Sequence, residues 1–193
     1  MMYEAKDFSA LLGTPGFSDE QLNVHFKLYQ GYVANTNKVA EKVTALAVSG
    51  ETGPEYAEMK RRFGWEFDGM RMHEYYFENI SKEPTTLATD SALAVALTKE
   101  FGSVEAWEKD FRATGALRGI GWAVLAYDRR GDRLFNVWVN EHDAGQLSGA
   151  EPIVVMDVFE HAFIFDYGMK RGEYIDAFMK ALDYNEASRR FSR

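Results

Sequence analysis

The chain has 193 residues, of which 46% are hydrophobic and 15% aromatic, enough for a sizeable core or two small domains. Its net charge of −8 argues against a nucleic-acid-binding protein, because neutralising phosphates requires an excess of Lys and Arg. Cysteine is absent, which excludes disulfides and thiolate metal ligands. No apolar run reaches membrane-spanning length and no signal peptide is recognisable, so we expect a cytoplasmic protein without a membrane partner.

Two long helices are predicted in the first half of the chain. Residues 18–21 (SDEQ) form a capping box, and apolar or aromatic residues then recur near a 3.6-residue period over 19–48. A second helical segment is expected over 54–80, loosened around Gly64 and Gly69. Together these segments predict a long helical hairpin.

The polar stretch 81–91 is the predicted boundary between two domains. We expect an N-terminal helical hairpin domain over 1–84 and a C-terminal domain over 85–193, giving an α+β fold with a small three-stranded antiparallel sheet. The elements predicted there are helices over 90–101 and 103–118, strands over 121–128, 133–140 and 152–156, and helices over 158–167 and 171–184. The first two strands flank the turn RRGD and predict a β-hairpin.

Four histidines are the main chemical feature of the sequence. They are His25, His73, His142 and His161. His25 shares one helical stripe with Tyr29 and Tyr32, because offsets of four and seven residues return to the same face. His161 follows Asp157 by one turn in the apolar segment DVFEHAFIFDYG, where a carboxylate and an imidazole are costly to bury without partners.

A metal ion is one partner that would satisfy these groups. Two helices and a strand end could bring together His25, His73, Asp157 and His161, a donor set that suits a first-row transition metal. A second interpretation stays open, in which each histidine is a hydrogen-bonded core residue and Asp157 caps a helix. No HxH or HExxH motif is present, so spacing alone does not decide between the two.

Five segments resemble the iron/manganese superoxide dismutase family, in family order over nearly the whole chain. They are HFKLYQGYVANTN (25–37), HEYYFENI (73–80), RGIGWAVL (118–125), DVFEHAF (157–163) and KRGEYIDAF (170–178). The DVFEHAF segment, which is similar to the family's DVWEHAY, is the most specific. The resemblance implies an enzyme that converts superoxide to dioxygen and hydrogen peroxide with one Fe or Mn ion per subunit.

The resemblance also implies roles for individual residues. The implied metal ligands are His25, His73, Asp157 and His161, with solvent as a fifth ligand. The residues implied to surround that solvent and to hold or relay protons are Tyr32, His142, Trp122 and Tyr29. His142 takes the place of a glutamine that donates a hydrogen bond, since Gly69 occupies the other family position for this donor. The alternatives are an exposed loop position for His142 and a purely core role for Tyr29.

The first helix departs from the family pattern. His25 and Tyr32 are seven residues apart, whereas the family spacing is eight. We interpret the difference as a regular helix that lacks a one-residue π-type bulge, which keeps His25 as the ligand. An ungapped alignment from Tyr32 would instead place Val24 in the ligand position, where it could not bind metal.

The resemblance further implies a homodimer or a dimer of dimers. Glu160 and Tyr167 are the implied interface residues, and Arg171 and Lys27 would supply positive potential in the substrate funnel. Two other functions are considered. A non-haem iron oxygenase would need more open metal positions than three histidines and an aspartate leave. A non-catalytic or altered-activity metal-binding homologue is favoured by the shortened helix spacing but disfavoured by the presence of all four ligands.

Overall fold

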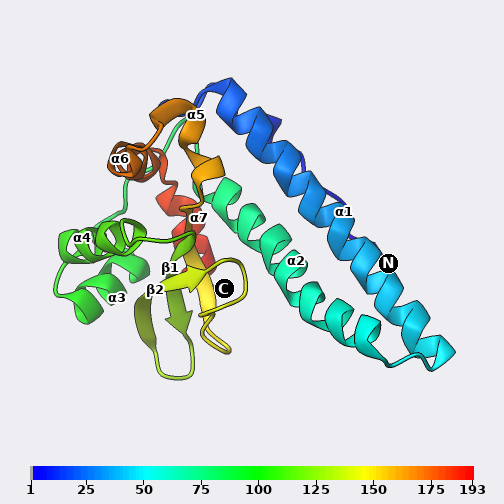
Figure 1. Cartoon of the computed structure of the whole chain (residues 1–193). Coiled ribbons are helices and arrows are strands. Elements are labelled where there is room, and N and C mark those ends of the chain that lie inside the picture. The colour runs from blue at the N-terminus through cyan, green and yellow to red at the C-terminus, as the bar shows by residue number, and fades with distance from the viewer. Residues whose placement is uncertain (1) are drawn as a thin grey trace.

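A computed structural model describes residues 2–193. A long pair of helices lies beside a second body that contains the sheet and the shorter helices (Figure 1). In chain order the elements are α1 (Asp19–Ser49), α2 (Pro54–Asn79), α3 (Ala92–Phe101), α4 (Val104–Gly115), β1 (Gly121–Asp128), β2 (Arg133–Asn140), β3 (Glu151–Asp157), α5 (Ile164–Tyr167), α6 (Arg171–Ala181) and α7 (Tyr184–Phe191), with 3₁₀ turns at Ser9–Leu11 and Glu160–Ala162. The predicted α+β fold is confirmed. Within residues 2–193, no helix is both long and apolar enough to cross a membrane.

The helical pair forms largely as its sequence predicts. The Ser18 hydroxyl accepts a hydrogen bond from the Gln21 amide and caps α1, and Gly50 ends that helix with a φ of 77°. The predicted loosening of α2 is wrong, because the helix runs without interruption through Gly64 and Gly69. A mid-helix glycine costs about 1 kcal/mol, and packing of α2 against α1 and β3 outweighs that cost.

The sheet places β1 at its centre, in the strand order β2-β1-β3 with antiparallel pairing throughout. The predicted hairpin is confirmed, with Gly121 opposite Asn140 and Asp128 opposite Arg133. On the other edge of β1, Trp122 lies opposite Asp157. The register therefore delivers Asp157, the last residue of β3, beside a buried tryptophan.

The segments after β3 differ from the prediction. Residues 158–167 form a 3₁₀ turn and the short α5 instead of one helix, and the segment 171–184 is broken before its end. The break occurs because Leu182 is extended and pairs with Ile80, while Asp183 caps α7 through the Asn185 amide. Short-range caps and one long-range bridge thus override a continuous helical pattern.

Candidate metal centre

The structure brings the four predicted ligands into one cluster. One ligand atom from each of His25, His73, Asp157 and His161 lies within 4.8 Å of the other three. The Asp157 Oδ2 atom is 3.1 Å from Nε2 of both His25 and His161, and 3.6 Å from Nε2 of His73. Residues from α1, α2, the end of β3 and the following turn therefore meet at a single point.

The first helix supplies His25 without any irregularity. α1 is an uninterrupted α-helix, and His25 is buried within it while its neighbour Val24 is 41% exposed. The ungapped alternative, which would place Val24 at the cluster, is excluded by this geometry. A regular helix with a seven-residue spacing to Tyr32 is sufficient to present His25 to the other three ligands.

His73 is oriented by its own helix. Its Nδ1 lies 2.5 Å from the carbonyl oxygen of Gly69, one turn earlier, so Nδ1–H donates and Nε2 faces the cluster with a free lone pair. In the part of the chain that the structure describes, this buried Nε2 has no hydrogen-bond partner. Burial lowers the pKa of His73 well below its ordinary value, which keeps the imidazole neutral, the form that binds metal.

Asp157 is fixed by backbone and side-chain hydrogen bonds at the end of β3. The Phe159 amide donates to its Oδ1 at 2.8 Å, and the Tyr174 hydroxyl donates to its backbone carbonyl at 2.6 Å. Burial opposes ionisation of this carboxyl, but the neighbouring His161 and His25 outweigh burial and hold its pKa below the ordinary range. The cluster therefore combines one carboxylate with three imidazoles.

This donor set fits an Fe or Mn ion. Nitrogen and oxygen ligands of this type suit first-row transition metals. The alternative in which all the histidines are satisfied core residues conflicts with the unpartnered His73 Nε2, because a buried polar atom without a partner is destabilising. A metal ion would satisfy that atom together with the carboxylate.

A second set of side chains adjoins the cluster. The Trp122 indole N–H donates to His142 Nδ1 at 3.2 Å, which leaves the proton of the neutral ring on Nε2. His142 Nε2–H then donates to the Tyr32 hydroxyl oxygen at 2.8 Å, and the Tyr32 ring stacks on the His73 ring. These bonds give the three side chains a single direction of hydrogen-bond donation, from Trp122 through His142 to Tyr32.

The environment of His142 contradicts the exposed-loop alternative. His142 is buried after β2, where the preceding Glu141 has a φ of 49° and Asn140 pairs with Ala144. Burial lowers the pKa of His142 to about 4, so the ring is neutral near pH 7. With the Trp122 indole N–H donating to Nδ1, the His142 ring is held with Nε2 toward the Tyr32 hydroxyl.

Tyr29 is not brought to this chain of hydrogen bonds. Its hydroxyl donates to Glu74 Oε1 at 3.0 Å and accepts from the Lys6 amide at 3.0 Å. Its ring is fully buried and packs against Phe8 and Phe77. The structure therefore places Tyr29 in the core, away from the Trp122–His142–Tyr32 hydrogen bonds, and we do not extend the proposed proton relay to it.

The two residues predicted for the substrate funnel lie in different surroundings. The Arg171 guanidinium donates to the carbonyl oxygens of Leu117 and Gly119, at 2.6 and 2.8 Å. Lys27 lies two residues after His25, about 200° around the helix, and lines a groove beside residues 5–9. The structure does not bring Lys27 to the metal cluster.

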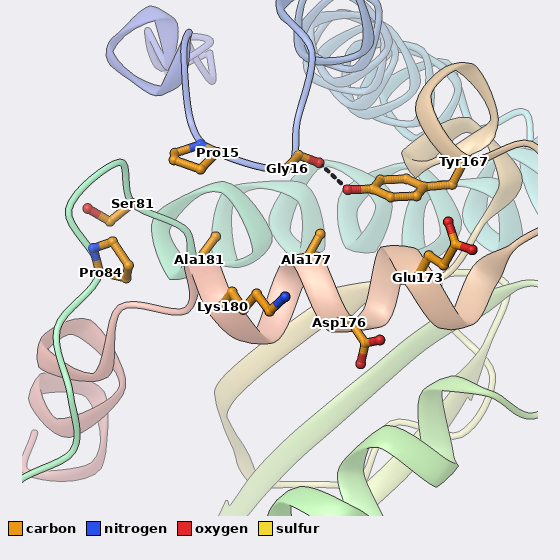
Figure 2. A pocket seen from close by; sticks show the side chains of 10 residues that line it. All are labelled: Pro15, Gly16, Ser81, Pro84, Tyr167, Glu173, Asp176, Ala177, Lys180 and Ala181. Carbon is orange, nitrogen blue, oxygen red and sulfur yellow. Dashed lines mark hydrogen bonds between the residues drawn. The ribbon is translucent and has the colours of Figure 1, made fainter.

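The predicted interface residues also differ in their surroundings. Glu160 is exposed at the start of the 3₁₀ turn that contains His161. The Tyr167 hydroxyl donates to the Gly16 carbonyl at 2.6 Å, within the same chain. Tyr167 also lines a cavity of about 420 Å³ between the loop before α1 and helix α6 (Figure 2), and none of the four cluster residues lines this cavity.

The sequence analysis did not identify Trp65, which adjoins the Tyr32–His142 pair. Its ring centroid is 4.6 Å from that of His142 and 5.5 Å from that of Tyr32, and its indole N–H donates to Glu141 at 2.9 Å. Its position eight residues before His73, about 80° away around α2, is the signal that could have revealed it.

Comparison with known proteins gives a consistent result. A family model described as iron/manganese superoxide dismutases, C-terminal domain, matches residues 89–190. The chain is 34% identical to superoxide dismutase (Mn) 2 of Haloferax volcanii, over 93% of this chain and 89% of that protein. It is 32% identical to superoxide dismutase (Fe) of Cupriavidus metallidurans, over 100% of this chain and 98% of that protein. A similar match, 33% identical over 92% of this chain and 89% of the relative, is to superoxide dismutase (Fe) of Methanothermobacter marburgensis.

Proposed function

The chain belongs to the iron/manganese superoxide dismutase family, and from this membership we propose that it converts two superoxide ions and two protons to dioxygen and hydrogen peroxide. The observation that carries the proposal is the buried convergence of three imidazoles and one carboxylate. We propose that His25, His73, Asp157 and His161 bind one Fe or Mn ion per subunit, between the helical hairpin domain (1–84) and the C-terminal domain (85–193). The relatives named for each metal match about equally well, so the proposal covers both.

The protein and the metal have separate tasks in this reaction. When bound, the Fe or Mn ion supplies the one-electron couple that takes an electron from one superoxide and gives an electron to the next. Asp157 contributes the single negative charge among the ligands, and burial lowers the pKa of both His25 and His73, which favours the neutral form that binds metal. The protein thereby sets the charge of the site through its own side chains.

Proton handling is assigned to Tyr32. Its hydroxyl oxygen accepts from His142, so its own O–H is free to donate toward a solvent molecule or a reduced oxygen species beside His73. Burial raises the pKa of Tyr32 above its ordinary value, which keeps this hydroxyl protonated. Trp122 and His142 orient the hydroxyl, and we propose that protons from solvent reach Tyr32 without passing through His142.

Attraction of superoxide is assigned to Arg171. An anionic substrate is repelled by a chain of net charge −8 unless local positive potential guides it. Arg171 is held by two backbone carbonyls, whereas Lys27 lines a groove beside residues 5–9. We therefore confine the proposed funnel role to Arg171.

We propose a homodimer, or a dimer of dimers, that uses the surface around Glu160. Ile164 and Phe165 are exposed beside the turn that carries Glu160 and His161. Such an apolar patch next to a site is typical of a subunit interface, and the family arrangement would let Glu160 reach the ligand histidine of the partner. Sedimentation of wild type and Phe165→Asp tests this, with a dimer expected for the first and a shift to monomer for the second.

Metal analysis and a superoxide-dismutation assay test the proposed function. Wild type and the control Val24→Ala are expected to contain about one Fe or Mn per chain and to be active, because Val24 points away from the cluster. His25→Ala is expected to lose both the metal and the activity. Metal without activity in wild type would identify an altered-activity homologue, and absence of Fe and Mn would refute the proposal.

A further inference from the structure

A buried carboxylate directly follows the proposed ligand His73 on α2. Glu74 follows His73 in sequence and is only 4% exposed. Its Oε1 accepts a hydrogen bond from the Tyr29 hydroxyl at 3.0 Å, and its Oε2 accepts one from Arg71 at 2.6 Å and lies 3.5 Å from Lys6 Nζ. A buried carboxylate is stable only when it is paired and hydrogen-bonded. Glu74 therefore favours the arrangement in which Tyr29, Arg71 and Lys6 stay beside it.

Tyr29 connects this carboxylate to the helix that carries His25. It lies one turn after His25 on α1, and its hydroxyl is held between Glu74 and the Lys6 amide. Sliding or rotation of α1 against α2 would break the hydrogen bond between Tyr29 and Glu74. The placement of the His25 ring, whose centroid is 5.0 Å from that of His73, therefore depends on the Tyr29–Glu74 contact.

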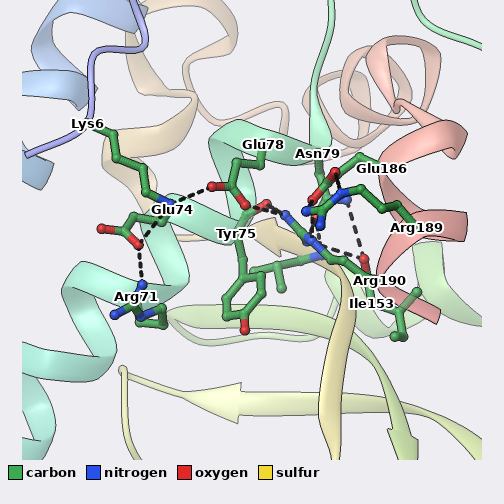
Figure 3. Close-up of polar contacts among 11 residues, drawn as sticks. Lys6, Arg71, Glu74, Tyr75, Glu78, Asn79, Ile153, Glu186, Arg189 and Arg190 are labelled. Atoms are coloured by element: carbon green, nitrogen blue, oxygen red, sulfur yellow. Dashed lines mark hydrogen bonds and ion pairs between the residues drawn. The ribbon is translucent and has the colours of Figure 1, made fainter. Parts of the chain in front are cut away.

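The same network continues to the strand that carries Asp157 (Figure 3). Lys6 Nζ donates to Glu78 at 2.7 Å, and the buried Arg190 of α7 donates to both Glu78 and Asn79 at 3.0 Å. Asn79 Oδ1 also accepts from the amide of Val155, two residues before Asp157, at 2.8 Å. The elements that supply three of the ligands are thus joined through one set of polar contacts.

We propose that Glu74 is a positioning residue of the metal centre, which governs how long the site retains its ion by fixing α1 against α2 through Tyr29. This inference rests on the proposed function, in which His25 and His73 bind the ion. Glu74 does not touch the ligand atoms and acts through the Tyr29 hydroxyl and the α2 backbone. If the network served only the stability of the fold, metal retention would not respond to the Tyr29–Glu74 contact in particular.

Two small substitutions and a matched control test the role of Glu74. Tyr29→Phe removes one hydroxyl, and Glu74→Gln removes one charge at constant size. Glu100→Gln makes the same chemical change in the ion pair of Glu100 with Arg133, at the surface of the C-terminal body.

The measurement is the rate at which purified, metal-loaded protein releases Fe or Mn to excess EDTA, far below the unfolding temperature. We expect about tenfold faster release in both test variants, no further increase in the double variant, and a rate within about twofold of wild type in the control.

Release rates within about twofold of wild type in both test variants would overturn the inference, and so would equal acceleration in the Glu100→Gln control. If purified wild type holds neither Fe nor Mn, the proposed function itself is wrong. Crystal structures of wild type and Tyr29→Phe then decide the positioning role separately. A changed placement of the His25 ring relative to His73 supports it, and unchanged rings overturn it.

Discussion

The helical pair α1–α2 and the end of strand β3 hold their metal ligands by different means. On the helices, His25 and His73 are buried where α1 packs against α2, and their placement depends on contacts between these two helices. At the end of β3, Asp157 is fixed by the Phe159 amide two residues later, and His161 follows within one turn. The first arrangement is long-range, whereas the second is mostly local.

This difference explains which sequence motif is the more specific. A local arrangement needs particular residues at fixed spacing, and DVFEHAF is the most specific of the matching segments because its geometry is contained within a few residues. An arrangement between helices only requires that the two packed faces match. The spacing between His25 and Tyr32 can therefore be seven residues on a regular helix and still bring His25 to the cluster.

The largest effect on metal content and activity is expected from substitution of Asp157, the ligand that local contacts hold at the end of β3. Asp157→Ala removes the only carboxylate of the cluster and the acceptor shared by His25 and His161. We expect less than about 0.1 Fe or Mn per chain and an activity loss of more than about 100-fold, measured by elemental analysis and a dismutation assay. The exposed Asp132→Asn serves as the control, and retention of metal by Asp157→Ala would show that the helical ligands suffice.

The next largest effect is expected at His142, in the loop between β2 and β3, which orients the Tyr32 hydroxyl. His142→Gln keeps an acceptor for the Trp122 indole and an N–H donor for Tyr32, so we expect activity within about threefold of wild type. His142→Ala removes both bonds and should reduce kcat about 10- to 100-fold while the metal content is unchanged. Equal activity of the two variants would mean that the orientation of Tyr32 is set by the helices alone.

Two glycines on α2 test how closely the helical pair is packed. A Cβ atom at Gly69 would lie 2.6 Å from Cδ1 of Tyr32, whereas nothing lies within 4 Å of the corresponding position at Gly64. We expect Gly69→Ala to lower the free energy of unfolding by about 1–3 kcal/mol and activity about tenfold, because Tyr32 is displaced from His142. Gly64→Ala should instead raise stability by up to about 1 kcal/mol, as measured by urea unfolding. A stable and active Gly69→Ala protein would contradict close packing at this point.

The smallest effect concerns pH at Asp68, which faces the charge of Asp143 in the loop that carries His142. Burial, with a further contribution from Asp143, raises the pKa of Asp68 to about 6 from its ordinary value of 3.8. The folded state therefore binds the additional proton between pH 4 and 6, and the contribution of this carboxyl to stability falls as pH rises through that window. At pH 8, Asp68→Asn should be about 1 kcal/mol more stable than wild type, a value reduced for the partial exposure of the side chain. Urea unfolding of metal-free wild type and Asp68→Asn at pH 4 and pH 8 measures this difference in stability. An equal difference at the two pH values would exclude ionisation of Asp68 as its cause.

Much of the fold could be predicted because its signals are local. The Ser18 cap, Gly50 and the RRGD turn set the limits of α1 and of the hairpin within one or two residues. The loosening expected at the glycines of α2 is wrong because helix packing outweighs intrinsic propensity. The break between α6 and α7 was missed because it depends on the pairing of Leu182 with Ile80, a contact between distant segments.

The sequence by itself determined the chemistry of the site: three histidines and an aspartate in segments that resemble one family, with a glycine where a side-chain donor would otherwise lie. Only the tertiary structure decided where the other polar side chains point. Tyr29 turns to Glu74, while His142 is fixed by the indole of Trp122 and donates to Tyr32. The physical reason is that hydrogen-bond direction depends on which donors and acceptors the packed elements bring within about 3 Å of each other, and these partners come from distant parts of the chain.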